Sequence, residues 1–290
     1  MTATPLDPRL HAVRPDLADA ALAGRVTAAR FVDGAPRRVG ASSTPLRKAP
    51  GRTSGWDSEL LRGEVVRVFD QTDDWAWVQS ETDRYVGYCE AAALVGFEPP
   101  PTHQVQVLRT FVYPEPDMKR PATGWLSLGG RLALEDTVVE TRGTRFRRLA
   151  DGSGAVVADH VADLGALPVA DFVATALRFL ETPYLWGGRT SLGLDCSALV
   201  QLSLMTAGIA APRDTDLQED ALGKPVDGGP EADLKRGDLV FWRGHIAIMV
   251  DEQTMVHASG HHMRVVVEPL TEAIGRIAAS AGPPTSVRRL

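Results

Sequence analysis

One cysteine and two histidines in the C-terminal part of the chain have the types and order needed for nucleophilic catalysis. Cys196 follows Asp195 and precedes a mostly apolar segment, so we expect it in the first turn of a helix that Asp195 caps. There the positive end of the helix dipole should lower the pKa of the thiol. His245 and His257 come later, and two antiparallel strands would bring both to one face. A thiol, a histidine base and a third polar group form the papain-like arrangement, in which the second histidine would accept or donate at the base's other nitrogen.

A second interpretation of these residues is open. Cys196 could be an ordinary buried residue, and the two histidines could be unrelated core or surface groups. The Gly-rich loop before Cys196 and the neighbouring Asp195 and Ser197 favour the catalytic interpretation. Cys89, by contrast, lies in a β-rich stretch without a nearby histidine, so we expect it to be a structural free thiol.

Two further histidines, His261 and His262, follow His257 closely enough to suggest a metal site. That spacing suits a helix, and Ser259 and Gly260 would break one. We therefore expect an exposed hairpin turn here, and neither a metal nor another cofactor.

The elements that must hold the site read as an α+β domain over residues 168–290. Apolar residues at helical spacing predict an amphipathic helix over 169–180, which Thr182 and Pro183 end. A second, buried helix should run from Cys196 and end before Gly208. The expected strands are Asp238–Trp242, His245–Val250, Thr254–Ala258 and Arg264–Glu268.

The part of the chain before residue 168 shows the period of β-strands. After an N-terminal arm over 1–25 with a short helical pattern, alternating strands and turns over 26–98 predict a small β-barrel. A stiff Pro99–Pro101 linker follows, and a second, less regular module is expected over 102–165.

The two modules share a spacing of glycines. Leu61-Arg-Gly63 is echoed by Leu128-Gly-Gly130, and a further glycine follows each at the same interval, Gly87 and Gly154. Chance similarity between two β-rich stretches is the alternative to a tandem repeat.

Composition limits the classes of partner. The chain of 290 residues carries 31 Lys and Arg against 37 Asp and Glu, a net charge of −6, and no basic run. We therefore expect neither nucleic acid nor an anionic membrane as the main partner. Residues 1–19 lack the apolar core of a signal peptide, and the two cysteines do not form a disulfide framework, so the expected location is the cytoplasm. The oligomeric state is left open.

The motifs of residues 168–280 resemble those of the NlpC-type bacterial cell-wall cysteine peptidases. They are, in chain order, Pro183-Tyr-Leu-Trp-Gly-Gly188, Asp195-Cys-Ser197, Pro212-Arg-Asp-Thr215, Gly237-Asp-Leu-Val-Phe-Trp242 and His245-Ile-Ala-Ile-Met-Val250. The resemblance implies Cys196 as nucleophile, His245 as general base and His257 as the third member. It also implies that the Tyr184 hydroxyl and the Cys196 N–H hold the oxyanion.

The upstream modules are similar to the bacterial SH3-like domains of a subgroup, the γ-D-glutamyl-L-diamino-acid endopeptidases. In that subgroup the first SH3-like domain closes the groove, so that only peptides with a free N-terminal L-alanine enter. Asp214 matches the amine-binding aspartate and Tyr85 the tyrosine of the first module, while Glu59 or Glu64 could supply another carboxylate. The remaining substrate-binding candidates within the motifs are Asp195, Ser197, Trp186 and Thr215.

Simpler roles exist for two of these residues, because Asp214 could be a turn or cap aspartate and Tyr85 a barrel-core aromatic. The chain also departs from the family pattern at Ala198 and Thr215, where glycine and serine are frequent; both changes keep small or hydroxyl-bearing residues.

The function that the resemblance implies is a cysteine endopeptidase acting on murein tripeptides or tetrapeptides in cell-wall peptide recycling. Two alternatives are a non-catalytic cell-wall peptide-binding protein and an amidase or acyltransferase on the same scaffold.

Overall fold

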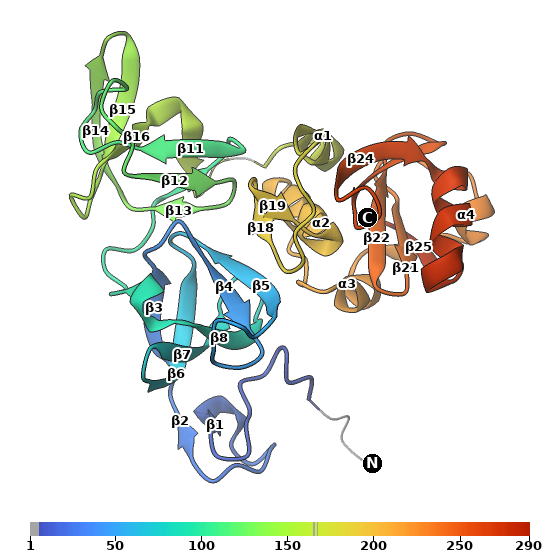
Figure 1. Cartoon of the computed structure of the whole chain (residues 1–290), viewed down its shortest axis with the longest axis horizontal. Helices are drawn as coiled ribbons and strands as arrows, with labels where there is room; N and C mark the ends of the chain where they lie inside the picture. The colour runs from blue at the N-terminus through green and yellow to red at the C-terminus, as the bar shows by residue number, and fades with distance from the viewer. Residues whose placement is uncertain (1–5, 165, 167) are drawn as a thin grey trace. The chain divides into compact units, whose positions relative to one another are not determined.

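The chain folds into two units, with the division between residues 166 and 167 (Figure 1). The computed structural model describes residues 6–164, 166 and 168–290. The first unit is built almost wholly of strands, and the second combines helices with one main sheet. The expected α+β class of the C-terminal domain and the β-rich character of the preceding part are confirmed.

The first β-module is one curved antiparallel sheet in the order β5-β4-β8-β7-β6-β3-β9. Its strands are β3 Ala35–Val39, β4 Ser43–Arg47, β5 Trp56–Leu61, β6 Val65–Thr72, β7 Trp75–Ser80, β8 Val86–Glu90 and β9 Leu94–Val95, with the 3-10 turn η2 Ala91–Ala93 before the last. Alternate residues point inward, and Val39, Leu46, Leu60, Val66 and Val78 are among the buried side chains of its core.

The N-terminal arm differs from the helical prediction. It contains β1 Ala18–Asp19 and the 3-10 turn η1 Ala20–Leu22, and β1 pairs with β2 Phe31–Val32, which follows the arm. Leu17 is buried in a cluster with Phe69 and Trp77 of the first module, so burial of one leucine outweighs a helical pattern too short to form a stable helix alone.

The second β-module consists of smaller sheets in the orders β13-β10-β17, β11-β12 and β14-β15-β16. Their bounds are β10 His103–Val105, β11 Arg109–Val112, β12 Gly124–Ser127, β13 Arg131–Leu132, β14 Leu134–Thr141, β15 Thr144–Leu149, β16 Ala155–Val157 and β17 Val161–Asp163, with the 3-10 turn η3 Ala158–His160 before β17.

Backbone hydrogen bonds show that this module repeats the first, with a correction to the predicted match. The Gly63 N–H donates to the Val39 carbonyl at 2.8 Å, and the Gly129 N–H donates to the Val105 carbonyl at 3.0 Å. Both glycines have positive φ, 75° and 89°. Gly63 therefore corresponds to Gly129 and not to Gly130, because strand pairing fixes the correspondence and a one-residue insertion lies between the repeats' glycines.

The second glycine pair matches as predicted. A Cβ at Gly87 would lie 2.9 Å from the Arg47 carbonyl oxygen, and one at Gly154 would lie 2.3 Å from the Tyr113 carbonyl oxygen. A side chain has no room at either position, so each glycine allows two backbone segments to approach closely.

The joint between the two modules is made by backbone. The Arg131 N–H donates to the Arg62 carbonyl at 2.7 Å, and a Cβ at Gly63 would lie only 2.0 Å from the Arg131 carbonyl oxygen. The turn at Gly63 thus makes a hydrogen bond within its own module and also contacts the backbone of the second module.

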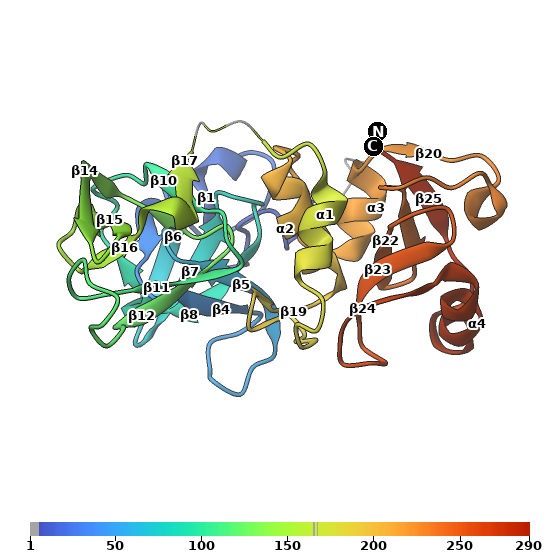
Figure 2. The same ribbon diagram turned by 90° about the horizontal axis from the view of Figure 1, so that it is seen from above.

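The second unit is a sheet with helices on both faces (Figures 1 and 2). Its helices are α1 Phe172–Arg178, α2 Cys196–Thr206, α3 Thr215–Ala221 and α4 Leu270–Ala281. The antiparallel sheet has the order β20-β25-β21-β22-β23-β24, with β20 Lys224–Pro225, β21 Leu239–Trp242, β22 His245–Met249, β23 Thr254–Ser259, β24 Arg264–Pro269 and β25 Ser286–Arg289. A small hairpin, β18 Arg189–Thr190 and β19 Gly193–Leu194, precedes α2, and the 3-10 turn η4 Gly229–Glu231 precedes β21.

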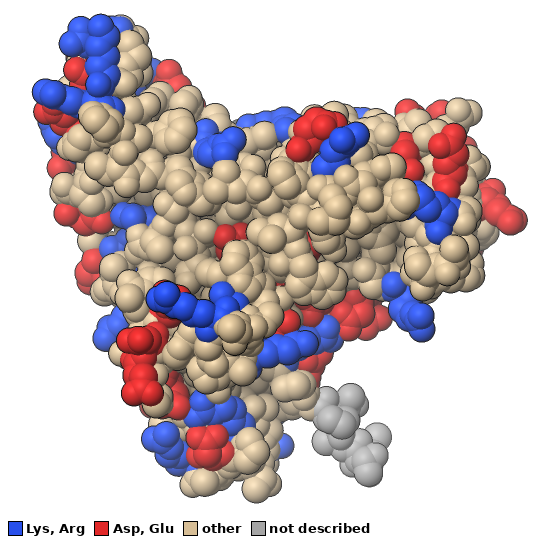
Figure 3. Space-filling model, in the orientation of Figure 1, with Lys and Arg blue, Asp and Glu red and all other residues tan. Residues whose placement is uncertain are grey.

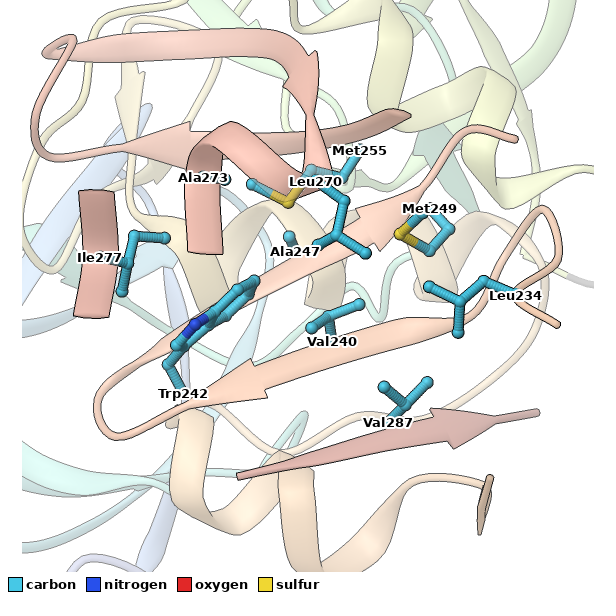
Figure 4. Close-up of a cluster of buried hydrophobic side chains, with 10 residues drawn as sticks. All are labelled: Leu234, Val240, Trp242, Ala247, Met249, Met255, Leu270, Ala273, Ile277 and Val287. Carbon is cyan, nitrogen blue, oxygen red and sulfur yellow. The ribbon is translucent and has the colours of Figure 1, made fainter. Parts of the chain in front are cut away.

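One face of the sheet packs on α4 through the cluster in Figure 4. Val240 and Trp242 come from β21, Met249 from β22, and Leu270 and Ile277 from α4. The opposite face packs on α2, which explains why β21 and β22 read as nearly continuous apolar runs. The four predicted strands are confirmed to within one residue at each end; α1 is shorter than predicted, and the sequence did not predict α3, α4 or β25.

Charges of both signs share the face shown in Figure 3. Acidic and basic side chains lie interspersed there, and much of the area between them is uncharged. Within the described residues, no helix combines the length and apolarity that crossing a bilayer requires.

Candidate active site

The N-terminus of α2 holds Cys196 as predicted. Asp195 is the N-cap, and its carboxylate accepts the Ala198 N–H at 2.9 Å. Gly208, with φ of 73°, lies just past the last turn. Cys196 is thus the first residue of a nearly fully buried helix and is itself only 6% exposed.

Arg213 fixes the cap from the other side. Its guanidinium makes paired bonds of 2.9 and 2.7 Å to the Asp195 carboxylate and donates to the Ser197 Oγ at 2.8 Å. Asp195 also accepts the Gly187 N–H at 2.9 Å, which ties the Gly-rich loop to the helix start. Asp195 therefore holds the loop in place, and Ser197 contacts Arg213, a supporting residue that the sequence analysis quoted only within a motif. Roles for Asp195 and Ser197 in substrate binding stay predictions.

The thiol of Cys196 is protonated at neutral pH. Burial and the neighbouring Asp195 charge raise the pKa of Cys196 to about 11, although hydrogen bonds from Thr215 and from the N–H groups of Ile246 and Ser197 oppose the rise. The expectation of a lowered pKa is thus wrong for the free protein, because loss of solvent outweighs the helix terminus. The Sγ atom lies 3.9 Å from the Thr215 Oγ1 and 4.0 Å from the Gly244 carbonyl oxygen, next to His245.

The two histidines meet as the sequence predicted. The Nε2 of His245 lies 2.7 Å from the Nδ1 of His257, across the strands β22 and β23. Burial lowers the pKa of His245 to about 3 and also lowers that of His257. Both imidazoles are therefore neutral at neutral pH and can accept a proton.

A carboxylate that the sequence analysis missed completes this row. The Nε2 of His257 lies 2.6 Å from the Oε1 of Glu268, and Arg276 of α4 donates to the same oxygen. Burial alone would raise the pKa of Glu268, but the bonds from His257 and Arg276 outweigh it and lower that pKa to about 2. Glu268 was expected only as the end of a strand; its pairing opposite Met255 brings it beside His257.

Tyr184 stands at the start of the Gly-rich loop. Its N–H donates to the Met263 carbonyl at 2.9 Å. Burial and the electrostatic influence of Cys196 both raise the pKa of the half-buried phenol. The hydroxyl therefore stays protonated and can donate to an oxyanion near the thiol.

Comparison with known proteins identifies the two kinds of domain. Residues 181–276 match the NlpC/P60 family, and residues 46–94 match the bacterial dipeptidyl-peptidase SH3 domain. The chain carries a cysteine peptidase domain of the NlpC/P60 family.

Relatives match this NlpC/P60 peptidase over most of its length. The dipeptidyl-peptidase 6 of Lysinibacillus sphaericus is 28% identical over 74% of this chain and 84% of the relative. The γ-D-glutamyl-L-lysine dipeptidyl-peptidase of Bacillus subtilis is 29% identical over 75% of this chain and 77% of its own. The crystal structure of an NlpC/P60 family protein from Bacillus cereus shares the fold, with a TM-score of 0.70 and 22% identity, over 88% of this chain and 99% of that one.

The candidate amine-binding aspartate of the NlpC/P60 domain, Asp214, directly precedes the residue whose hydroxyl contacts the Cys196 thiol. Asp214 is the N-cap residue of α3, yet within the described chain its carboxylate makes no capping hydrogen bond. The next residue, Thr215, is the one whose hydroxyl contacts the Cys196 Sγ. Trp186, from the Gly-rich loop, is 67% exposed.

The three candidate residues of the first SH3-like module make contacts with other residues of that module. Tyr85 is buried in the core cluster of the barrel, and Glu59 accepts a hydrogen bond of 2.6 Å from the Ser43 hydroxyl. Glu64 accepts the Leu61 N–H at 2.9 Å and so closes its own turn. Roles for Tyr85 and Glu59 in substrate binding stay predictions.

Cys89 and the histidine pair His261 and His262 lie as expected. Cys89 is a buried free thiol whose pKa burial raises to about 12. His261 and His262 are exposed in the turn between β23 and β24. Among the described residues, none of the histidine, cysteine and acidic side chains group in a way that could hold a metal ion.

Proposed function

We propose that the protein hydrolyses the γ-D-glutamyl–L-diamino acid bond of murein peptides that carry a free N-terminal L-alanine. The position of Asp214 carries this proposal: this acidic residue directly precedes Thr215, whose hydroxyl contacts the nucleophile. The names of the Lysinibacillus and Bacillus relatives, both dipeptidyl-peptidases, support release of a two-residue product.

The reaction begins with the Cys196 thiol. Sγ attacks the γ-carbonyl carbon of D-glutamate while His245 takes the thiol proton. Because the pKa of the thiol is raised, proton transfer accompanies the attack and does not precede it. The Cys196 N–H and the Tyr184 hydroxyl donate to the oxyanion.

The intermediate then collapses to a thioester. The C–N bond breaks, and the proton held by His245 passes to the departing amine of the diamino acid. His245 next takes a proton from water, whose oxygen attacks the thioester and releases L-Ala-γ-D-Glu with the thiol restored.

Asp214 supplies selectivity for the free amine. An ammonium group on its carboxylate forms a charge-assisted hydrogen bond, which contributes roughly 1.5–3 kcal/mol. Acetylation removes the charge and adds bulk, so the two effects together should lower kcat/KM on the order of 10²-fold. Such selectivity favours peptides already cut from muramic acid, which fits a role in recycling in the cytoplasm.

The test compares L-Ala-γ-D-Glu-L-Lys with its N-acetyl form, with products identified by mass spectrometry. Wild type should release L-Ala-γ-D-Glu from the free peptide, and Asp214→Ala should lose most of the preference between the two peptides. Asp220→Asn is the matched control, because Asp220 is an exposed carboxylate on the same helix α3. Equal cleavage of both peptides by wild type would contradict the amine site, and a product other than the dipeptide would reassign the bond.

A further inference from the structure

Glu268 is the end of a hydrogen-bonded row that runs through both histidines. Its Oε1 accepts from His257 at 2.6 Å and from Arg276, and its Oε2 lies 3.8 Å from the Nε2 of His262. The carboxylate is ionised at neutral pH, since its pKa is lowered to about 2. An ionised carboxylate only accepts hydrogen bonds.

This fixes the tautomer of His257. Because Glu268 cannot donate, the Nε2 of His257 must carry the proton that lies between them. The pKa of His257 is lowered by burial, so the ring is neutral and carries a single N–H. Its Nδ1 is therefore an acceptor.

The tautomer of His245 follows in turn. The Nε2 of His245 lies 2.7 Å from the accepting Nδ1 of His257 and so must carry its ring's proton. The Nδ1 of His245 is then the nitrogen with a lone pair for the thiol proton. In the opposite tautomer, Nδ1 would be protonated and the base would have no acceptor on that side.

The same row stabilises His245 once it has taken the proton. The imidazolium keeps its Nε2–H bond to His257. His257 in turn donates to the Glu268 carboxylate, whose negative charge stabilises the positive charge on His245 through this row. Glu268 itself does not need to gain a proton, just as the buried aspartate of a serine-protease triad does not. Arg276, from α4, holds the carboxylate oxygen in place.

We propose that Glu268, held by Arg276, is a positioning residue that sets the tautomers of His257 and His245 so that the Nδ1 of His245 receives the thiol proton. The proposal rests on the peptidase mechanism given above and adds a fourth member to its row of residues. Neither the family match nor the names of the relatives assigns this role.

Three variants of the full-length chain test it. Glu268→Leu removes the acceptor, and Glu268→Gln keeps an acceptor oxygen without the charge. Glu272→Gln is the matched control, because Glu272 is an exposed carboxylate in the first turn of α4. Each variant is compared with wild type in thermal unfolding, to confirm that it is folded, and in kcat and KM across pH.

Glu268→Leu should lower kcat roughly 100-fold while KM changes little, because the loss falls on the proton transfer; misorienting a histidine by removing its partner costs about 10- to 10⁴-fold elsewhere. Glu268→Gln should recover most of kcat. Burial and Arg276 lower the pKa of both histidines, as do His257 at His245 and His262 at His257, while the Glu268 charge raises both pKa values. In both variants the acid limb of the pH profile should therefore move to lower pH.

Two results would overturn the proposal. One is a folded Glu268→Leu with the kcat and pH profile of wild type. The other is an equal loss of kcat in the Leu and Gln variants with no shift of the acid limb, which would assign Glu268 a purely structural role.

Alkylation of Cys196 by iodoacetamide separates this proposal from the proposed substrate, since it needs no peptide. At neutral pH the rate should fall in Glu268→Leu and return in Glu268→Gln. If wild type fails to cleave the murein peptide but the alkylation rates follow this order, the substrate assignment fails and the positioning role stands. Equal alkylation rates in all four proteins would count against the role itself.

Discussion

Opposing effects act on the pKa of the Cys196 thiol. The start of α2 favours a thiolate, while burial and Asp195 favour the thiol, and the second pair of effects is larger. The sequence could indicate the helix start, because Asp195 and Gly208 mark its ends. It could not indicate the burial, which depends on how strand β22 packs against that helix turn.

The first residue-scale prediction concerns which cysteine is the nucleophile. Cys196→Ala should abolish hydrolysis and leave the melting temperature close to that of wild type, whereas Cys89→Ala should stay active, although it leaves a small cavity in the barrel core. Steady-state hydrolysis of the murein peptide, with thermal unfolding of each variant, checks this. Turnover by Cys196→Ala at the wild-type rate would remove the cysteine mechanism.

The second concerns pH. With the pKa of Cys196 raised to about 11, its thiolate fraction grows with pH throughout the neutral range. Alkylation of Cys196 in the free protein should therefore rise with each pH unit between about 6 and 9 and should remain faster than that of the more strongly shifted Cys89. A rate that levels off below neutral pH would instead show a preformed thiolate–imidazolium pair.

At the scale of elements, the strands of the second unit follow from their apolar runs, and their turns follow from the residues between them. The position of Glu268 relative to His257 does not follow, because it depends on the register between β23 and β24, where Met255 lies opposite Glu268. The role of Arg276 could not be predicted either, because the sequence analysis did not predict helix α4, which carries it.

The Gly-rich loop and the start of α2 depend on one buried ion pair. Asp195 and Arg213 are 10% and 1% exposed, with 2.7 Å between them. Arg213→Met should lower the free energy of unfolding by roughly 3–5 kcal/mol, because it leaves a buried charge without its partner.

The matched control for this prediction is Arg236→Met. Arg236 and Asp171 are separated by the same 2.7 Å but are 41% and 48% exposed. Solvent screens that pair, so the loss should be at most about 1 kcal/mol. Denaturant unfolding of both variants decides, and losses of similar size would show that burial of the Asp195–Arg213 pair is not the cause.

At the scale of the whole molecule, the first unit is a tandem of two β-modules whose joint includes the turn at Gly63. Gly63→Ala would place a Cβ 2.0 Å from the Arg131 carbonyl oxygen and would also strain a φ of 75°. Gly24→Ala would strain the backbone in the same way, since its φ is 78°, but it would cause no clash, because no atom lies within 4 Å of the added Cβ. Gly63→Ala should therefore melt at a clearly lower temperature than Gly24→Ala, whose cost is about 1–2 kcal/mol. Similar melting temperatures for the two would show that the contact with Arg131 contributes nothing.

That joint also bears on how the two modules can diverge. This joint is a contact between main chains beside a glycine. The side chains around it therefore need only be small enough to fit, whatever their type. The second module can therefore change most of its side chains and still dock in the same way, provided that Gly63 remains. The match to the bacterial SH3 domain covers residues 46–94 of the first module, whereas the backbone pattern recurs in the next module.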